Sequence, residues 1–278
     1  MRKSEGKGYR VTAVVRATAV LDLLASEGPL TVSQITSKLR LPRTSTFHLI
    51  KTLESTGLIR WIPEGNRYTL GLRIVDLSSR ALGQLDIRRI AHPHLVRLSG
   101  QSGETSHLQV LELQTAEVVC IDRIESREPL QVRAWIGKRN PWHATASGKV
   151  FAAYASAEDL RYLLDDHTLQ RPTPSTRHGR EQLLRELEEV RGRGYAFNDE
   201  ELMPGIRAVA APILQSPEVC LAAVSLIGPT TRMTDDRMRE LAAAVADTAR
   251  SIAIELGARG VGDAPSGAQP DRRGLSHR

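Results

Sequence analysis

The sequence predicts an α+β protein with two domains, a small N-terminal domain of three short helices and a β-hairpin, and a larger C-terminal domain with a mainly antiparallel sheet. Hydrophobic spacing in the first seventy residues changes from helical periods to two short β-prone runs, and beyond residue 86 helical and strand patterns alternate. Residues 1–80 hold 13 Lys and Arg against 6 Asp and Glu, whereas the remainder holds 25 against 26. This asymmetry indicates a polyanionic partner for the first domain and a different partner for the second.

The N-terminal domain is predicted to open with two helices. Residues 1–10 are polar and contain glycine, so we expect a flexible basic arm there. The apolar residues within 13–26 fall mostly on one helical face, which predicts the first helix. Thr31 followed by Gln34 is the signature of a capping box, and it predicts a second helix that runs to about residue 39.

A third helix and a hairpin complete this domain. Pro42 suits the first position of the third helix, whose expected buried stripe consists of Phe47, Leu49, Ile50 and Leu53. The β-prone runs 58–62 and 67–70 are separated by Pro-Glu-Gly-Asn, which is turn chemistry and predicts a hairpin. Three short helices followed by a hairpin is the layout of a winged helix-turn-helix, which we assign to residues 11–71. A helix over about 72–82 then predicts a linker, assigned to residues 72–85.

Polar residues on the third helix and its neighbours are the candidates for contact with double-stranded DNA. The first half of a recognition helix enters the major groove, where arginine suits a guanine edge and hydroxyls suit phosphates or base edges. The start of the second helix suits backbone phosphates, and the wing suits the minor groove. A run of hydroxyl residues that merely begins a helix is the alternative for the third helix. The candidates are Ser33, Gln34, Arg43, Thr44, Ser45, Thr46, His48, Lys51, Asn66 and Arg67.

The C-terminal domain, assigned to residues 86–257, mixes both kinds of element. Helices are expected over 87–102, from Ser147 onward, and over 158–164, 180–192 and 235–256. Strands are expected over 107–112, 118–125, 130–134, 209–214 and 221–227. The last residues, 258–278, are rich in Gly, Pro, Arg and Asp and predict a disordered tail.

Composition limits the location of the protein. The longest apolar runs, around 209–214 and 221–227, are too short to cross a bilayer, and we find no signal peptide, so no membrane partner is expected. The two cysteines, Cys120 and Cys220, lie far apart in apolar surroundings and cannot build a disulfide framework or a thiolate metal site. A reducing cytoplasm is the expected location.

An enzyme is the main alternative class. The sequence holds no Gly-x-Ser-x-Gly, no His-Glu-x-x-His and no Gly-rich phosphate loop, so we name no catalytic residue and no cofactor. His92 and His94 favour packing or capping over metal binding, and the acidic run Asp199–Glu201 favours a solvated loop. Two alternatives stay open: an enzyme in the C-terminal domain, and a DNA-binding module whose C-terminal domain only assembles subunits.

Several blocks of sequence, taken in order, resemble the IclR family of bacterial transcription regulators over about Val11 to Gly257. The N-terminal blocks are Leu30-Thr-Val-Ser-Gln-Ile, Leu41-Pro-Arg-Thr-Ser-Thr-Phe-His-Leu-Ile, Leu53-Glu-Ser-Thr-Gly and Arg67-Tyr-Thr-Leu-Gly. The C-terminal blocks are His143-Ala-Thr-Ala-Ser-Gly-Lys, Phe197-Asn-Asp-Glu-Glu, Gly205-Ile-Arg, Val209-Ala-Ala-Pro and Ser225-Leu-Ile-Gly-Pro. Blocks of this number in this order are highly specific.

The resemblance implies a GAF-like effector-binding domain over 86–257, and a homodimer or homotetramer that binds partly palindromic operators. Effector and operator binding would then be linked by a coupling free energy of a few kcal/mol at most. Repression is one outcome of such binding. The sign depends on where the operator lies relative to the promoter, which no residue encodes.

The resemblance also implies a set of effector contacts. In relatives, a small acid is held by backbone amides after the His-Ala-Thr segment, an acidic side chain, a residue before the Val-Ala-Ala-Pro strand, and two hydroxyls. The corresponding positions in this sequence are Ala146, Ser147, Asn198, Ala208, Ser225 and Ile227.

Three of these positions depart from the family pattern: Asn198 replaces the acid, Ala208 a polar or thiol residue, and Ile227 a hydroxyl. Each lost polar partner would leave a carboxylate oxygen unpaired at about 1–3 kcal/mol. We therefore expect a less polar pocket, and a partly apolar or aromatic carboxylate, or a related catabolite, as effector. Trp135 and Trp142 are candidates to line this pocket, with core packing as the alternative for each.

Overall fold

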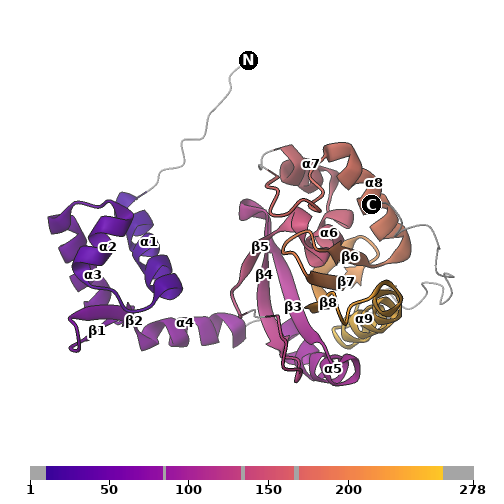
Figure 1. Cartoon of the computed structure of the whole chain (residues 1–278), viewed down its shortest axis with the longest axis horizontal. Helices are drawn as coiled ribbons and strands as arrows, with labels where there is room; N and C mark the ends of the chain where they lie inside the picture. The colour runs from indigo at the N-terminus through magenta and orange to yellow at the C-terminus, as the bar shows by residue number, and fades with distance from the viewer. Residues whose placement is uncertain (1–10, 84–85, 133–134, 166–168, 259–278) are drawn as a thin grey trace, which may run out of the picture. The chain divides into compact units, whose positions relative to one another are not determined.

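The protein is described by a computed structural model over residues 11–83, 86–132, 135–165 and 169–258. The chain divides into two compact units, residues 1–84 and residues 85–278 (Figure 1). This division falls at the end of the predicted linker helix. The predicted arm over residues 1–10 and all but the first residue of the predicted tail over 258–278 lie outside the described residues.

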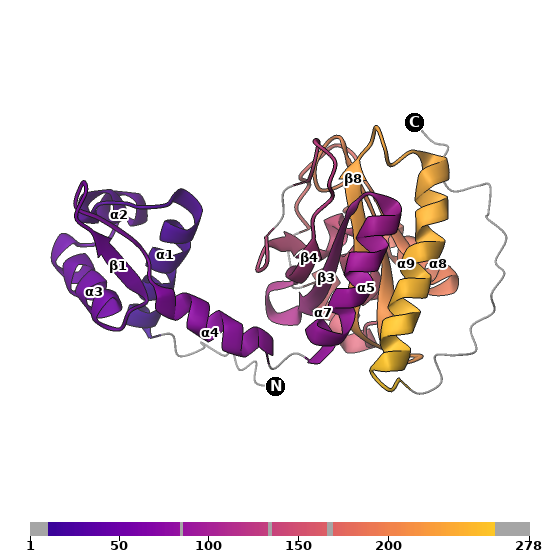
Figure 2. The same cartoon turned by 90° about the horizontal axis from the view of Figure 1, so that it is seen from below.

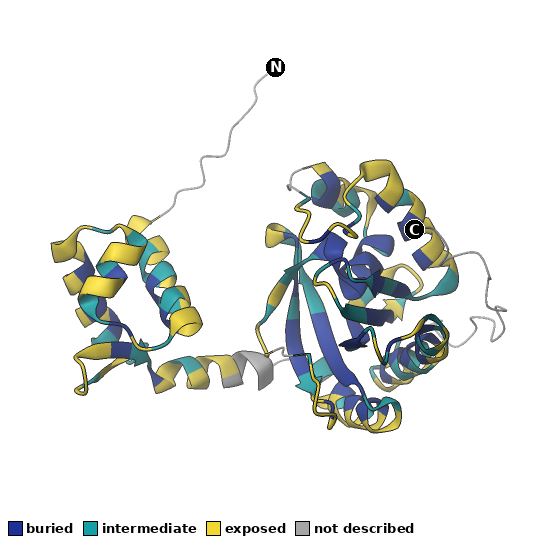
Figure 3. Ribbon diagram, viewed as in Figure 1, coloured by how far each residue is buried: buried dark blue, intermediate teal, exposed yellow. Residues whose placement is uncertain are grey.

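The N-terminal unit has the predicted helices and hairpin. Its helices are α1 (Thr12–Glu27), α2 (Val32–Leu39), α3 (Arg43–Ser55) and α4 (Leu72–Gly83), and its antiparallel hairpin is β1 (Ile59–Ile62) with β2 (Arg67–Leu70). The capping box forms as predicted, because the Thr31 hydroxyl accepts from the Gln34 amide while the Gln34 side chain accepts from the Thr31 amide at 2.8 Å. One core joins helices to hairpin (Figure 3), made of Val20, Leu24, Leu30, Ile35, Ile50, Leu53, Ile59 and Tyr68.

The residues of α3 that are buried in this core differ from the predicted ones. Ile50 and Leu53 are buried as predicted, but Phe47 is 49% exposed and Thr46 is 1% exposed. The Thr46 hydroxyl donates to the Pro42 carbonyl at 2.9 Å, so its burial leaves no unpaired polar group. Pro42 precedes the helix as its N-cap and is not its first residue. The prediction that Phe47 belongs to the buried stripe is therefore wrong.

The C-terminal unit is built on one six-stranded sheet, ordered β5-β4-β3-β8-β7-β6 with every neighbouring pair antiparallel. Helices α5 (Asp86–Ser102) and α9 (Asp235–Glu255) lie side by side on one face (Figure 2). Helix α6 (Ala146–Ala153) covers the other face, with α7 (Ala157–Asp165) and α8 (Arg180–Arg193) against it. The strands are β3 (Thr105–Glu112), β4 (Glu117–Ile124), β5 (Arg139–Pro141), β6 (Ala196–Asp199), β7 (Ile206–Ser216) and β8 (Val219–Pro229). This arrangement confirms the predicted mixed fold.

Two edge strands differ from the prediction. The described part of the expected strand over 130–134 is not a strand, because β5 occupies the edge beside β4 and pairs Asn140 with Val118. At the opposite edge, β6 forms where no strand was expected, and its last residue, Asp199, belongs to the acidic run that was expected to be a loop. This strand is only four residues long and pairs with β7 alone. Because Asn198 and Asp199 have low β-propensity, its sequence gave little signal of a strand.

Helix α6 can approach the preceding 3₁₀ turn η2 (Trp142–Ala144) only because its third residue is glycine. A Cβ atom at Gly148 would lie 2.0 Å from the carbonyl oxygen of Trp142, a distance that no side chain tolerates. The Thr145 hydroxyl accepts from the Gly148 amide at 3.1 Å and caps the helix. The first turn of α6, with Ala146 and Ser147, is thereby fixed over the sheet. None of the helices in the described ranges is both long and apolar enough to cross a membrane.

Candidate DNA-binding surface and effector cavity

One side of α3 carries most of the residues predicted to enter the major groove. Arg43, Thr44, His48 and Lys51 are exposed, and their helical spacing separates them from the buried Ile50. The Ser45 hydroxyl is also exposed and donates to the carbonyl of the N-cap at 3.0 Å. Thr46 is buried and its hydroxyl is bonded to the N-cap carbonyl, so its position contradicts the prediction that it contacts DNA.

Phe47 joins this exposed side of α3, and the sequence analysis missed it as a surface residue. Its ring lies edge-on to that of His48, with 6.1 Å between ring centroids. An exposed aromatic ring beside groove-facing polar groups is suited to apolar contact with a thymine methyl group. The signal was present in the sequence: Phe47 follows Arg43 by four positions, which places both on one helical face.

Lys51 is positioned to carry a persistent positive charge. Its Nζ lies 2.8 Å from a Glu54 carboxylate oxygen and 5.9 Å from the centroid of the Tyr68 ring. Hydrogen bonding to Glu54 and then to Tyr68 raises the pKa of Lys51 above its usual value. The pairing also restrains the side chain, which is suited to contacting a phosphate beside the groove.

The start of α2 and the wing supply the remaining candidates. Ser33 and Gln34 are exposed. The side-chain oxygen of Gln34 accepts a bond from the Thr31 amide in the capping box, so only its side-chain nitrogen is suited to contacting a phosphate. In the wing, the Trp61 indole donates to the Asn66 side-chain oxygen at 2.8 Å, and Asn66 has a left-handed backbone with φ of 50°. Arg67 is exposed, and its Nε donates to the Glu64 carbonyl at 3.4 Å.

The second candidate site is a cavity between the sheet and α6. The Ser106 hydroxyl of β3 donates to the Leu95 carbonyl of α5 at 3.0 Å, so Ser106 faces α5. Because side chains alternate along a strand, His107 and Gln109 do not share that side and face α6 instead. On the neighbouring strands, Asn198 of β6, Ala208 of β7 and Ile227 of β8 lie directly opposite one another and form one row across the sheet.

All six positions carried over from the family resemblance line this cavity. They are Ala146, Ser147, Asn198, Ala208, Ser225 and Ile227. The other lining residues are His107, Gln109, Cys120, Val132, Lys138, Asn140, Thr145 and Leu202. The enclosed volume is about 50 Å³. A cavity that admits a benzene-sized ring measures about 150 Å³, so this form of the cavity has room for an acid of only a few atoms.

The two tryptophans predicted to line the pocket are elsewhere. Trp142 is 1% exposed and packs in the core with Val118, Val150 and their neighbours. Trp135 is 60% exposed, and the Lys138 amine lies 5.3 Å from its ring centroid. Neither tryptophan is among the residues that line the cavity, so the prediction of pocket lining is wrong for both. Trp142 packs in the core, which was the alternative, and Trp135 lies at the surface.

The polar groups of the cavity favour an anion. Ala146 and Ser147, the first two residues of α6, line the cavity, so the first-turn amides, which have no acceptor within the helix, and the positive end of the helix dipole lie at the cavity wall. Lys138 adds a positive charge to the lining. Two other polar side chains are already committed, because the Ser225 hydroxyl donates to Gln109 at 2.8 Å and the Asn198 amide donates to the Ala144 carbonyl at 2.8 Å. A carboxylate at the α6 N-terminus satisfies this arrangement.

Five polar lining residues were missed from the sequence: His107, Gln109, Lys138, Asn140 and Thr145. These residues make the cavity more polar than we expected from the polar groups that are missing at positions 198, 208 and 227. One signal was available, since Thr105, His107 and Gln109 place polar residues at every second position in the first part of β3. Asn140 gave no signal because its strand, β5, was not predicted, and Lys138 gave none because it lies directly before that strand.

The acidic run Asp199–Glu201 is bonded within the protein. Arg207 Nε lies 2.6 Å from Asp199, the Gly205 amide donates to Glu200 at 2.6 Å, and Glu201 pairs with the buried Lys149. These residues hold the turn that follows the cavity residue Asn198. No group of His, Cys, Asp and Glu suited to a metal ion is found within the described ranges.

Lys149 of α6 lies at the centre of a buried charge cluster with Glu186 of α8 and Glu201. Its Nζ is 2.8 Å from Glu186 and 2.9 Å from the Phe197 carbonyl, and Glu186 also pairs with Arg177. Burial raises the pKa of Glu186, but the cations of Lys149 and Arg177 outweigh this and leave it lowered. Burial raises the pKa of Glu201 despite Lys149. The two carboxylates thus differ in how fully their charge is compensated.

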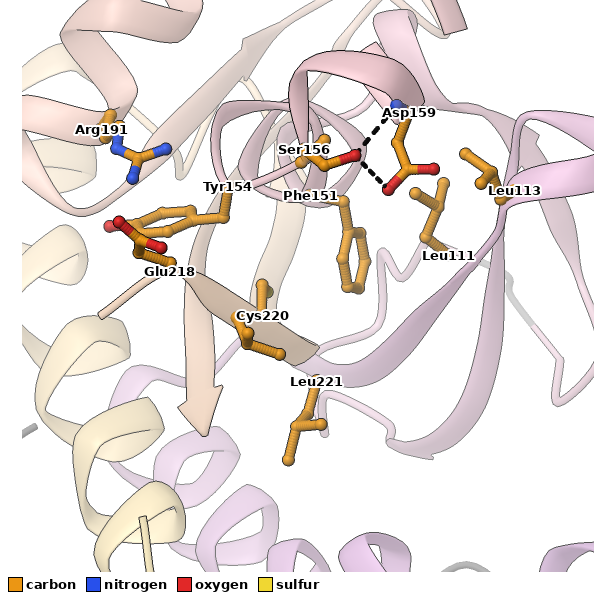
Figure 4. Close-up of a pocket in the computed structure, with 12 residues that line it drawn as sticks. Leu111, Leu113, Phe151, Tyr154, Ser156, Asp159, Arg191, Glu218, Cys220 and Leu221 are labelled. Atoms are coloured by element: carbon orange, nitrogen blue, oxygen red, sulfur yellow. Dashed lines mark hydrogen bonds between the residues drawn. The ribbon is translucent and has the colours of Figure 1, made fainter. Parts of the chain in front are cut away.

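A larger groove of about 630 Å³ lies elsewhere on the C-terminal unit (Figure 4). Phe151, Leu111 and Leu221 give it an apolar lining, and the Ser156 hydroxyl donates to the Asp159 carboxylate on its rim at 2.8 Å. It contains none of the six carried-over positions. Among the described residues, none of its side chains has a buried polar atom without a partner, whereas His107 in the smaller cavity has one. The smaller cavity is therefore the stronger candidate for an effector site.

Comparisons with known proteins give matches for both units. A family model described as "IclR helix-turn-helix domain" matches residues 13–63, and one described as "Bacterial transcriptional regulator IclR C-terminal" matches residues 79–254. The chain is 31% identical over 249 residues to the transcriptional repressor IclR of Escherichia coli K12, covering 89% of this chain and 91% of the relative.

Solved structures agree with these matches. The IclR structure from Thermotoga maritima has 30% identity and a TM-score of 0.72, covering 88% of this chain and 98% of that one. An IclR homolog from Microbacterium hydrocarbonoxydans, solved in complex with 4-hydroxybenzoate, has 26% identity and a TM-score of 0.71, covering 86% of this chain and all of that one. The relatives are transcription regulators and not enzymes.

Proposed function

The chain belongs to the IclR family of bacterial transcriptional regulators, and from this we propose that it binds an operator through α3 and the wing, under control of a small carboxylate held in the cavity beneath α6. The observation that carries the proposal is the convergence of six positions, from α6, β6, β7 and β8, on one cavity that includes the first two residues of α6. We expect it to act in the cytoplasm, as a homodimer or homotetramer, because a partly palindromic operator offers two equivalent half-sites.

For DNA, the proposal rests on the exposed side of α3. Arg43, Thr44, Phe47 and His48 are exposed, while Ile50 and Leu53 of the same helix lie in the core. Arg43 would pair with a guanine edge or a phosphate, and Lys51 would contact the flanking backbone. The excess of basic residues over residues 1–80 supports a polyanion as the partner of this unit.

For the effector, we propose a carboxylate with a partly apolar body. The α6 N-terminus and Lys138 would hold the carboxylate, and Val132, Leu202 and Ile227 would contact the apolar part. The relative solved with 4-hydroxybenzoate supports aromatic acids as candidates. Since the cavity encloses about 50 Å³, a ring acid would have to displace lining side chains, whereas a short acid would not.

The proposal is tested on purified full-length protein. We expect a specific complex with DNA from upstream of its own gene, together with stabilisation by one class of carboxylate. A ligand at 100 times its Kd should stabilise the protein by about 2.7 kcal/mol, which a thermal-shift screen detects. Failure to bind any upstream or neighbouring fragment would contradict the regulator proposal. Specific DNA binding with no response to any metabolite would favour a C-terminal domain that only assembles subunits.

A further inference from the structure

His107 carries a buried polar atom for which the protein supplies no partner. The side chain is 5% exposed, and its Nε2 has no hydrogen bond among the described residues. Buried polar atoms are normally paired, because leaving one unpaired costs the free energy of its lost hydration. Within the cavity lining, His107 alone shows such an atom in the described part of the chain.

The strand position of His107 places its side chain on the cavity side of the sheet, among the lining residues. His107 lies on β3, the strand between β4 and β8, and pairs with Ser225 on β8 and Arg123 on β4. It faces α6 and not α5, since its neighbour Ser106 bonds to α5. The Ser225 hydroxyl donates its proton to Gln109, so it does not donate to the imidazole.

The charge state of His107 limits what it can recognise. Burial, reinforced by the nearby Arg123 and Lys138, lowers the pKa of His107 to about 4. At neutral pH the ring is therefore uncharged, with one N–H donor and one bare nitrogen acceptor. A hydroxyl group both donates and accepts, so it can pair with Nε2 in either tautomer. Lys138 also lines the cavity and adds a positive charge near it, although its amine lies 5.3 Å from the centroid of the Trp135 ring.

We propose that His107 is a specificity residue that hydrogen-bonds a hydroxyl group of the effector, so that the ligand is a hydroxy-carboxylate. This inference rests on the proposed function, because it assumes that the cavity beneath α6 holds the effector. The carboxylate occupies the α6 N-terminus, and the hydroxyl meets His107 on the floor formed by β3. An acid that lacks the hydroxyl leaves Nε2 unpaired and binds less tightly.

The test uses two pairs of acids that differ by one hydroxyl, propionate with lactate and benzoate with 4-hydroxybenzoate, titrated calorimetrically into the full-length protein. We expect the hydroxylated member of at least one pair to bind about ten- to a hundredfold more tightly. His107→Leu should abolish this preference while retaining binding of the parent acid, and His107→Gln, which keeps a polar group, should preserve part of it. A preference that survives in His107→Leu would overturn the proposal while leaving a carboxylate effector in place.

A second readout needs no ligand. Because Nε2 has no partner in the protein, replacing His107 by the similarly sized leucine should leave the Tm unchanged or raise it. A fall of about 3 °C or more would mean that the ring makes a stabilising bond of its own and would overturn the proposal. If none of the four acids binds the wild-type protein, this result would contradict both the hydroxy-carboxylate inference and the carboxylate effector proposed above.

Discussion

The side-chain amide of Asn198 donates a hydrogen bond to the carbonyl oxygen of Ala144, with 2.8 Å between the two atoms. The same side chain accepts a bond from the Glu201 backbone amide at 3.0 Å. An aspartate could accept the second bond but could not donate the first. Asparagine at this position therefore ties β6 to the turn before α6 and joins two walls of the cavity.

Replacing Asn198 by Asp should weaken this connection. The carboxylate would face a carbonyl oxygen, and the loss of a buried bond should lower the free energy of unfolding by about 1–3 kcal/mol. The added negative charge should also weaken binding of carboxylates. Urea unfolding and calorimetric titration measure both effects. Asn140→Asp is the control, because it adds the same charge to the cavity lining, and an equal loss of stability in both variants would contradict the role given to Asn198.

Removing the buried amine of Lys149 should lower the free energy of unfolding, because this amine pairs with two buried carboxylates. Lys149→Met leaves Glu186 and Glu201 without their shared cation, and breaking a buried pair in this way costs about 3–5 kcal/mol. The matched control is Lys38→Met, because Lys38 pairs with Glu27 at the surface and such pairs contribute about 1 kcal/mol or less. Thermal unfolding compares the two variants. Similar small losses in both would show that the buried cluster does not hold the fold.

His107 should make stability depend on pH. The folded protein keeps the ring neutral to about pH 4, whereas the unfolded chain protonates near its ordinary value of 6.5. The unfolded state therefore binds more protons between these values, and stability falls as pH drops through that window, by roughly 3 kcal/mol in full. Urea unfolding of wild-type and His107→Gln proteins at about pH 7 and about pH 4.5 isolates this contribution. An equal loss in both proteins would exclude His107 as its source.

The sequence predicted the layout of both units because their elements have strong local signals. The capping box at Thr31 and the turn after Trp61 act within a few residues and need no tertiary contact. The six carried-over cavity positions also came together. His107 and Lys138 were missed because their role depends on which strands become neighbours, and the sequence does not state strand order. Trp135 and Trp142 were misplaced because residue type alone does not tell a core ring from an exposed one.

Thr44 and Thr46 should respond differently to substitution although they lie two positions apart. Thr44 is exposed on α3, so Thr44→Ala should weaken operator binding, by about 1 kcal/mol for a single lost hydrogen bond. Thr46 is buried and bonded to Pro42, so Thr46→Val should lower stability by a similar amount and leave the affinity of the folded protein for DNA unchanged. Fluorescence anisotropy with labelled operator, and thermal unfolding, separate the two effects. Loss of DNA affinity in folded Thr46→Val would contradict the orientation of α3.

The central claim is that the exposed side of α3 binds an operator. Its most direct test is the affinity of the full-length protein for its own upstream DNA as a function of salt, compared between wild type, Arg43→Ala and the charge-matched control Lys38→Ala. We expect steep weakening with salt and a loss of about 1–3 kcal/mol in Arg43→Ala, with little change in the control. Equal affinities in all three proteins, or no specific complex at any salt concentration, would contradict the claim.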